Sequence, residues 1–354
     1  MIAIGLMSGT SLDGVDAAVI ETDGERVFMT GKTATLFYED ALRWRLRAVL
    51  DAAPGLAVDD PEVLGLSRVI ADRHAEAVAL LGSAADIVGF HGQTILHDPA
   101  RARTWQIGDA GLLAHKTLLP VAYDFRSADV AAGGQGAPLA PLFHAAMAAE
   151  LEKPLLVVNI GGVANITYLG ADDAILACDT GPGNGPLDDW MTAHTGAAYD
   201  ADGALARSGL ADAGRLEMLL EDDYFALPAP KSLDRLHFSA RIATATAGLP
   251  AADGAATLAA FTAAAIAAAP LPQAPKRVLV AGGGRHNQAI MACLRARFAV
   301  PVEPVEAVGW DGDALEAQCF GFLAVRVLRG LPLSLPGTTG VGHPMVGGRI
   351  LWPG

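Results

Sequence analysis

Apolar and polar positions along this 354-residue chain form a short repeating pattern at the start of each half. Residues 2–7 and 15–21 are two apolar runs separated by a turn rich in glycine and hydroxyl groups. Residues 155–169 repeat the arrangement around Gly161 and Gly162. Apolar, β-branched runs bounded by glycines are typical of strands. The pattern therefore predicts a β-hairpin at the head of each half, and two lobes built on related plans.

Helical segments follow each hairpin. In 285–298, for example, apolar residues recur at helical spacing, and 313–330 is apolar over much of its circumference, which predicts a buried helix. The predicted helical segments are 39–50, 61–82, 186–196, 285–298 and 313–330. Further strands are predicted at 86–90, 175–179 and 276–281. Strands that alternate with helices indicate an α/β fold.

The chain has more residues than usually fold around a single hydrophobic core, so we expect two lobes. The expected bounds are residues 1–125 plus 331–354 for the N-terminal lobe and 126–330 for the C-terminal lobe. No low-complexity linker separates the halves. We therefore expect the lobes to lie close together across a cleft.

Acidic side chains outnumber basic ones, since 39 Asp and Glu against 25 Lys and Arg give a formal net charge of −14. Such a charge repels nucleic-acid backbones and anionic membrane surfaces. We therefore expect a small-molecule partner, no nucleic acid and no membrane. The Ala-rich segment 258–272 carries Thr262 and ends at prolines, which favours a buried helix over a membrane span.

The chain enters a strand directly, without a basic region or an apolar signal core, and this predicts a cytoplasmic protein. Its cysteines, Cys178, Cys293 and Cys319, lack C-x-x-C spacing and are odd in number. Buried thiols in a reducing compartment account for them. We expect no disulfide and no zinc site.

The first hairpin turn, SGTSLDG, has the composition of a phosphate-binding loop. Gly9 and Gly14 have the spacing of a P-loop, yet Val15 and Asp16 stand where that motif has Lys and Ser or Thr. The turn is therefore not a Walker loop. Glycine turns can nevertheless present backbone N–H groups to phosphates.

Side chains of the same turn extend this prediction. Thr10 and Ser11 offer hydroxyls, and Asp13 is placed to hold Mg²⁺ directly or through water. The alternative is an ordinary hairpin in which Asp13 and Gly14 only make the bend. Both interpretations stay open on this motif alone.

Three further glycines, Gly282, Gly283 and Gly284, lie between a predicted strand and a predicted helix. A dinucleotide-binding motif fails on spacing, because its third glycine would be residue 287, which is Asn. The plain alternative is a helix-entry turn in which glycine adopts positive φ.

Asp179 ends an apolar strand and precedes the rigid loop TGPGN. A carboxylate held at a fixed place in this way can act as a general base. The alternative is an Asp that caps a helix or braces the loop.

Two polar clusters could bind a polar small molecule. His91, Gln93 and Thr94 follow a predicted strand and suit hydroxyls and an amide, while Arg126 lies between two aspartates and suits a carboxylate. The alternatives are a hydrogen-bonded loop histidine and a bridge from Arg126 to a neighbouring aspartate. Glu316, a rare charge on an apolar helix, either reaches the site or lies on a solvated edge.

Seven segments stand out along the chain: MSGTSLDGVD, GFHGQTILHDP, TWQIGD, DFRSADVAAGGQGAPLAP, NIGGVANITYL, CDTGPGN and VAGGGRHN. They occur in the order found in anhydro-N-acetylmuramic acid kinases, and the chain resembles that family from residue 5 to about residue 330. The resemblance implies two ribonuclease-H-like lobes of the sugar kinase, actin and heat-shock protein superfamily, which close on ATP and Mg²⁺. It also implies a homodimer that serves the recovery of cell-wall sugars.

By the resemblance, glycine turns of both halves hold ATP, with adenosine at the third turn and Mg²⁺ at Asp13. The implied ATP-binding residues are Gly9, Thr10, Ser11, Leu12, Asp13, Gly14, Val15, Asp16, Gly161, Gly162, Gly282, Gly283 and Gly284. The implied sugar-binding residues are His91, Gln93, Thr94, Arg126 and Glu316, with Arg126 on the lactyl carboxylate.

Asp179 is the catalytic base by the same resemblance. The substrate's O6 is tied up in a 1,6-anhydro bridge, so a base is needed before any hydroxyl can be phosphorylated. Asp179 would activate a water that attacks C1, and the released O6 would attack the γ-phosphorus of ATP.

The sequence departs from the family pattern within 230–238, where Leu233, Asp234 and Leu236 replace a more usual Thr-Gly and Glu. Two rival functions fit the same scaffold. One is a kinase for another amino sugar or sugar acid, and the other is a nucleotide-driven assembly or chaperone protein of the actin type. In the second rival, Asp179 and the HGQT cluster would have no task.

Overall fold

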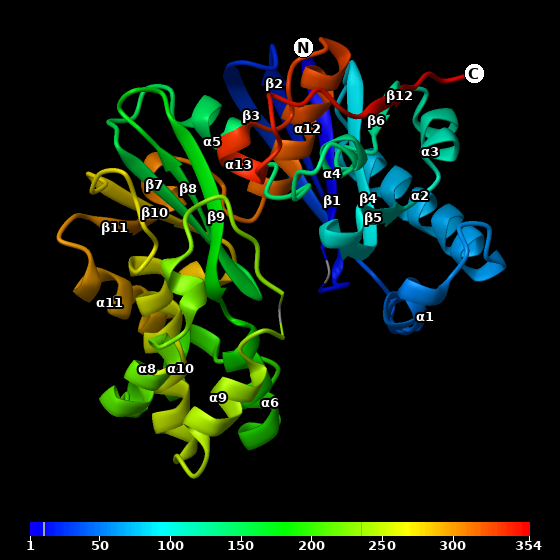
Figure 1. Ribbon diagram of the computed structural model, residues 1–354. Coiled ribbons are helices and arrows are strands. Elements are labelled where there is room, and N and C mark those ends of the chain that lie inside the picture. The colour runs from blue at the N-terminus through cyan, green and yellow to red at the C-terminus, as the bar shows by residue number, and fades with distance from the viewer. Residues whose placement is uncertain (10, 235) are drawn as a thin grey trace. The chain divides into compact units, whose positions relative to one another are not determined.

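The computed structural model describes every residue except 10 and 235, and the chain divides into two compact units (Figure 1). The first unit comprises Met1–Ala149 and Ala314–Gly354, and the second comprises Glu150–Asp313. Along the chain, the second unit is therefore an insertion into the first.

These bounds place 126–149 and 314–330 in the first unit, whereas the sequence analysis assigned both segments to the C-terminal lobe. Packing of helix α12 (Leu315–Leu328) explains the difference for the second segment. A Cβ added to Gly5 on strand β1 would lie 1.7 Å from the carbonyl oxygen of Ala317. The helix backbone thus lies directly on the strand, and only glycine permits so close an approach.

The first unit is built on one mixed sheet whose order is β12-β6-β4-β1-β2-β3, with β5 paired to β4. Strand β2 is antiparallel to both neighbours, while β1, β4 and β6 are mutually parallel. The strands are β1 (Ile2–Ser8), β2 (Gly14–Thr22), β3 (Val27–Phe37), β4 (Ile87–Asp98), β5 (Arg103–Ile107), β6 (Val121–Tyr123) and β12 (Arg349–Leu351).

The second unit repeats this plan with the order β11-β10-β7-β8-β9. Strand β8 is antiparallel to both neighbours, and β7, β10 and β11 are parallel. The strands are β7 (Leu155–Ile160), β8 (Val163–Leu169), β9 (Ile175–Pro182), β10 (Arg277–Ala281) and β11 (Val302–Pro304). Both units therefore have three antiparallel strands followed by two parallel ones, in the same order. This is the ribonuclease-H-like arrangement. The predicted fold class is confirmed.

Helices cover both sheets. Those of the first unit are α1 (Asp40–Ala52), α2 (Pro61–Leu81), α3 (Ala110–Thr117), α4 (Ser127–Ala131), α5 (Pro141–Met147), α12 (Leu315–Leu328) and α13 (Pro336–Thr339). Those of the second are α6 (Gly185–Thr195), α7 (Ala204–Ser208), α8 (Ala213–Leu220), α9 (Ser239–Thr246), α10 (Ala251–Ala267) and α11 (Gln288–Arg297). Short 3₁₀ turns lie at Ala53–Gly55, Pro99–Arg101, Ala201–Gly203, Asp223–Ala226, Gly283–His286 and Val305–Val308.

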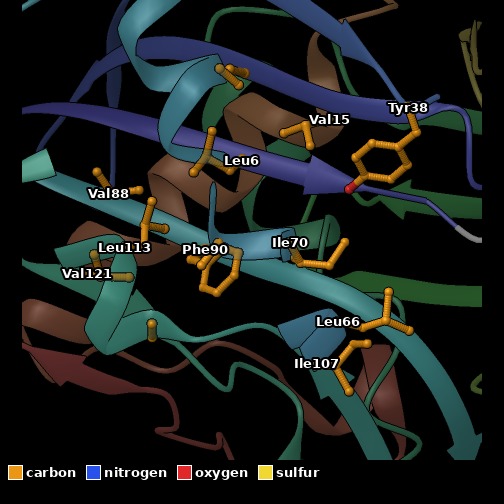
Figure 2. Packing of buried hydrophobic residues seen from close by; sticks show 14 of the residues in the cluster. Leu6, Val15, Tyr38, Leu66, Ile70, Val88, Phe90, Ile107, Leu113 and Val121 are labelled. Carbon is orange, nitrogen blue, oxygen red and sulfur yellow. The ribbon is translucent and has the colours of Figure 1, made fainter. Parts of the chain in front are cut away.

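Figure 2 shows the core of the first unit between α2 and the sheet. Leu66 and Ile70 of α2 are completely buried and lie beside Phe90 of β4 and Ile107 of β5. Burying such a side chain contributes about 1.5–3 kcal/mol. This packing therefore holds in place strand β4, which also carries the polar HGQT cluster.

Strand β4 is longer than predicted. It runs to Asp98, so the HGQT cluster lies within the strand and not after it. The reason is strand β5, which returns antiparallel beside this extension and pairs Gln93 with Ile107. Polar side chains are tolerated in the extension because the second strand satisfies its backbone.

Two further element ends were predicted wrongly. Strand β9 continues past Asp179 to Pro182, because β8 still pairs with it beyond a bulge. Helix α11 begins at Gln288 and not at 285, because the Asn287 side chain accepts the N–H groups of Ala289 and Ile290 and so caps the helix there.

The Ala-rich segment forms helix α10, whose residues from Gly254 to Ile266 are buried, as predicted. In the described part of the chain, none of the helices combines the length and apolar character needed to cross a membrane.

Candidate active site

The β1–β2 turn of the first unit exposes the side chains that were predicted to bind phosphate and metal. Ser11 and Asp13 face solvent, and the Asp13 carboxylate lies 3.6 Å from the Arg43 guanidinium. Leu12 adopts φ +62° and is 2% exposed, which anchors the turn in the core. Thr10 lies outside the described residues. Leu12 therefore anchors the turn, while the side chains of Ser11 and Asp13 are accessible to solvent.

Gln93 braces this turn from strand β4. Its Nε2 donates to the carbonyl of Gly9 at 3.1 Å, and its Oε1 accepts the Ser8 hydroxyl at 2.6 Å. The Gln93 side chain is completely buried. Two of the predicted residue groups, the glycine turn and the HGQT cluster, are thus in direct contact.

The remaining predicted residues of this turn lie in the sheet. Val15 is completely buried, and the Oδ1 of Asp16 accepts the Thr35 hydroxyl at 2.6 Å from the neighbouring strand. A Cβ on Gly14 would lie 2.3 Å from the carbonyl oxygen of Leu36. These contacts belong to β2–β3 pairing.

His91 and Arg126 form a pair that the sequence did not indicate. Arg126 Nε and Nη2 lie 3.2 and 3.0 Å from His91 Nε2. A guanidinium can only donate, so Nε2 accepts, and Nδ1 carries the proton that His91 donates to the Gly92 carbonyl at 2.8 Å. Burial and the Arg126 charge hold the pKa of His91 well below its usual value. The histidine is therefore a neutral acceptor that orients Arg126.

The loop after α4 holds the other side of this guanidinium. Arg126 Nη1 donates to the Gly136 carbonyl at 2.8 Å, and the Gly136 N–H donates to Asp129 at 2.6 Å. Asp129 also accepts the Ser334 and Thr339 hydroxyls. Neither neighbouring aspartate bridges to Arg126 directly. Burial lowers the pKa of Arg126, and the carboxylates of Glu316 and Asp129 oppose the shift.

The last two predicted sugar-binding residues are Thr94 and Glu316. Thr94 accepts an amide hydrogen bond from Gln106 at 3.2 Å, and Glu316 is exposed on α12, where its charge acts on Arg126. Beside His91, a cavity of about 450 Å³ opens within the first unit. Aromatic and polar side chains line it, including Phe90, His91, Trp105, Gln106, Tyr123, Asp124 and Arg349. Such a mixture suits a sugar, whose faces are apolar and whose edges carry hydroxyls.

In the second unit, Asp179 lies at a β-bulge. Strand β8 pairs Asn165 with Asp179 and then Ala164 with Gly181, so Thr180 is the extra residue. A bulge redirects the adjacent side chain out of the regular pleat. Burial raises the pKa of Asp179 to about 6, although the Leu233 N–H that it accepts at 2.8 Å lowers it. The carboxylate is therefore ionised at neutral pH and considerably more basic than an ordinary aspartate.

The glycine turns of this unit lie at one edge of its sheet. Strands β7 and β10 are parallel neighbours (Figure 1). Their carboxyl ends, at Gly161 and Gly282, therefore meet there. Asn184 connects the turns, because its N–H donates to the Gly161 carbonyl at 2.7 Å and a Cβ on Gly284 would lie 3.2 Å from its Oδ1. Exposed Gly162 and Gly283 leave backbone open there. Asn184 ends the CDTGPGN motif, yet the sequence analysis did not predict it as a site residue.

Among the described residues, no group of three or more His, Cys, Asp and Glu side chains is arranged to hold a metal ion. Asp13, whose carboxylate is paired with Arg43, therefore belongs to no such group. A single carboxylate still fits Mg²⁺ in a nucleotide kinase, because phosphate oxygens and waters supply its other ligands.

Comparison with known proteins identifies the family. A family model described as anhydro-N-acetylmuramic acid kinase matches residues 1–353. The chain belongs to this family. An anhydro-N-acetylmuramic acid kinase of Acidiphilium cryptum (strain JF-5) is 78% identical over 354 residues, covering 100% of this chain and 99% of the relative. Its counterpart in Gluconobacter oxydans (strain 621H) is 55% identical over 359 residues, covering 99% of both.

A solved structure also aligns with this member of the anhydro-N-acetylmuramic acid kinase family. It is a ROK family glucokinase from Streptomyces griseus in complex with glucose and AMPPNP, with 15% identity and a TM-score of 0.42 over 92% of this chain and 99% of that chain.

Proposed function

We propose that the protein is an ATP-dependent kinase that hydrolytically opens 1,6-anhydro-N-acetylmuramic acid and phosphorylates it at O6, giving N-acetylmuramic acid 6-phosphate. Family membership and relatives named for this activity support the substrate. The observation that carries the mechanism is the raised basicity of Asp179, which is ionised at neutral pH and fixed at a bulge. A general base is what ring opening by water requires.

In the proposed reaction Asp179 accepts a proton from water as the water oxygen bonds to C1 of the sugar. The C1–O6 bond breaks, and O6 becomes available as a nucleophile. O6 then bonds to the γ-phosphorus while ADP leaves. General base catalysis of this kind contributes about 10²–10⁴-fold to the rate.

For ATP, the proposal assigns the phosphates to backbone N–H groups of the glycine turns, with Ser11 adding a hydroxyl. Asp13 would hold Mg²⁺, since its carboxylate is 62% exposed and offers the oxygen that this cation prefers. When bound, Mg²⁺ neutralises charge that develops on the transferred phosphoryl group. Gly282, Gly283 and Gly284 would pack against adenosine.

For the sugar, the proposal assigns Arg126 to the lactyl carboxylate. Its guanidinium is already oriented by His91 and by the Gly136 carbonyl, so little conformational entropy would be lost on binding. The adjoining cavity, with Trp105 and Gln106 in its wall, has room for the pyranose ring.

The cellular setting is part of the proposal. The anhydro-sugar is a fragment of the bacterial cell wall, so an enzyme that converts it into a sugar phosphate would serve cell-wall recycling. We place that enzyme in the cytoplasm, where ATP is available, and expect it to act as a homodimer.

An isotope experiment tests the function directly. The protein is incubated with ATP, Mg²⁺ and the anhydro-sugar in ¹⁸O water, and the product is analysed by mass spectrometry. We expect ¹⁸O at C1 and an unlabelled phosphate ester at O6. A phosphorylated product that lacks the ¹⁸O label would contradict hydrolytic ring opening, and absence of phosphorylation would contradict the kinase.

A further inference from the structure

Strand β9 is the edge strand of the second sheet, and a loop of main chain covers its open edge at Asp179. The Asp179 N–H donates to the carbonyl oxygen of Lys231 at 2.9 Å. This is the hydrogen bond that an additional strand would make. Residues 231–233 therefore stand in for a sixth strand at this one position.

The next hydrogen bond departs from strand pairing. The Asp179 carbonyl oxygen already accepts the Tyr224 hydroxyl at 2.8 Å. The Leu233 N–H, which points to the same edge, donates instead to Oδ2 of the Asp179 side chain at 2.8 Å. The N–H, the carbonyl and one carboxylate oxygen of Asp179 are thus all held by the segment 224–233.

The groups that hold Asp179 are themselves anchored. Tyr224 is 6% exposed and packs edge-on against Phe238, with ring centroids 6.1 Å apart and an angle of 87°. Lys231 Nζ donates to the Tyr224 carbonyl at 2.7 Å and lies 4.3 Å from the centre of its ring. Asp222 accepts the Tyr224 N–H at 2.9 Å. The loop is therefore tied to a buried aromatic cluster.

We propose that the Leu233 amide is a positioning group for catalysis: it fixes Oδ2 of Asp179, so that Oδ1 is the oxygen that takes the proton of the attacking water. The inference rests on the proposed role of Asp179 as the base. A carboxylate can rotate about its Cβ–Cγ bond, and one hydrogen bond on a rigid donor removes that freedom. The proton acceptor then keeps one orientation between turnovers.

This role explains the departure of the loop from the family pattern. The contact with Asp179 is made by the main chain of residue 233, and a main-chain N–H is supplied by any residue except proline. Leu233 and Asp234 can therefore differ from the usual Thr-Gly without loss of the contact. The Lys231 side chain, by contrast, is used to anchor Tyr224.

The amide also opposes the effect of burial on the carboxylate. Burial raises the pKa of Asp179, and the Leu233 N–H lowers it. Removing that N–H should therefore raise the pKa further, because a hydrogen bond to a charged group is stronger than one to its neutral form. A loop that only supported the fold would leave the titration of Asp179 unchanged.

The test replaces Leu233 by its α-hydroxy acid through nonsense suppression, which exchanges the N–H for an ester oxygen and keeps the side chain. We expect the acidic limb of the kcat/KM profile to move to higher pH by about one unit, with ATP and sugar affinities unchanged. Leu233→Ala keeps the N–H and should leave the profile unchanged. The same ester at Leu236, whose N–H donates to Asp234, controls for an ester in this loop.

An unchanged acidic limb in the Leu233 ester would overturn the inference. The proposed function fails separately, if Asp179→Asn keeps its activity. Should the ester protein not fold, Tyr224→Phe decides the matter. It frees the Asp179 carbonyl to compete for the Leu233 N–H, and should shift the acidic limb in the same direction, whereas a profile identical to that of the wild type would count against the inference.

Discussion

Replacing Asp179 by Asn should greatly lower the activity and stabilise the protein at the same time. The amide keeps the shape of the side chain and can still accept the Leu233 N–H through its carbonyl oxygen. It cannot accept a proton from water, so turnover should fall by about 10²–10⁴-fold. ATP and the anhydro-sugar should still bind.

The gain in stability follows from the pKa of the buried carboxyl. Raising it from an ordinary value of 3.8 to about 6 means that ionisation opposes folding. Below pH 4 the carboxyl is protonated in both the folded and unfolded states, and no penalty exists. Between pH 4 and 6 the penalty grows, and above pH 6 it reaches about 3 kcal/mol. Asn removes it, so the variant should gain up to about this amount at pH 7 and nothing at pH 3.5.

Three measurements on one variant separate the possibilities: a coupled assay of ADP release, calorimetry for both ligands, and chemical denaturation at pH 7 and pH 3.5. Asp173→Asn, which alters an exposed carboxylate of the same unit, is the matched control and should change none of them. Turnover near the wild-type rate would move the base to another carboxylate, with Glu316 the first to test. Loss of both ligands would make Asp179 structural, and an unaltered stability at pH 7 would refute the reasoning from burial.

Other perturbations give further predictions. Asp13→Asn should weaken ATP binding in the presence of Mg²⁺ but not in its absence, measured by calorimetry; equal affinities with the metal would contradict the metal assignment. Gly5→Ala should lower the free energy of unfolding by about 3 kcal/mol or more, because its Cβ meets the α12 backbone, while Gly55→Ala, which meets nothing within 4 Å, should be nearly neutral. His74 is completely buried, and desolvation lowers its pKa to about 4. The free energy of unfolding should therefore decrease as the pH is lowered from 6.5 to 4. His74→Leu should be more stable than the wild type by about 2 kcal/mol at pH 5 and unchanged at pH 8, and parallel stability curves would refute this.

The hairpins at the head of each unit could be predicted from the sequence because their information is local. Apolar β-branched runs bounded by Gly161 and Gly162, for example, admit few other structures. The same is true of α2, where Asp60 caps the first turn and Gly82 ends the helix with φ +54°. Family motifs then added the substrate, which no local pattern specifies.

The contacts within the site could not be predicted, because they join residues far apart in the chain. His91 and Arg126 are 35 residues apart, and no local sequence pattern connects them. Leu233 is 54 residues from Asp179 and contributes only a backbone N–H. A main-chain donor carries no side-chain signature, so no reading of residue types can select it. The end of β4 was predicted wrongly for a similar reason. Its polar extension is a strand because it pairs with β5, which follows later in the chain.

The insertion of the second unit into the first has a consequence for synthesis on the ribosome. Once Asp313 has emerged from the ribosome, the whole of Glu150–Asp313 is available and that unit can complete its sheet. The first unit still lacks α12, which packs on β1 and β4. Until the C-terminal segment emerges, the face of the sheet around Gly5 and Gly89 has no covering helix. The half of the protein that is made first is therefore the last to become folded, and premature termination leaves an exposed sheet.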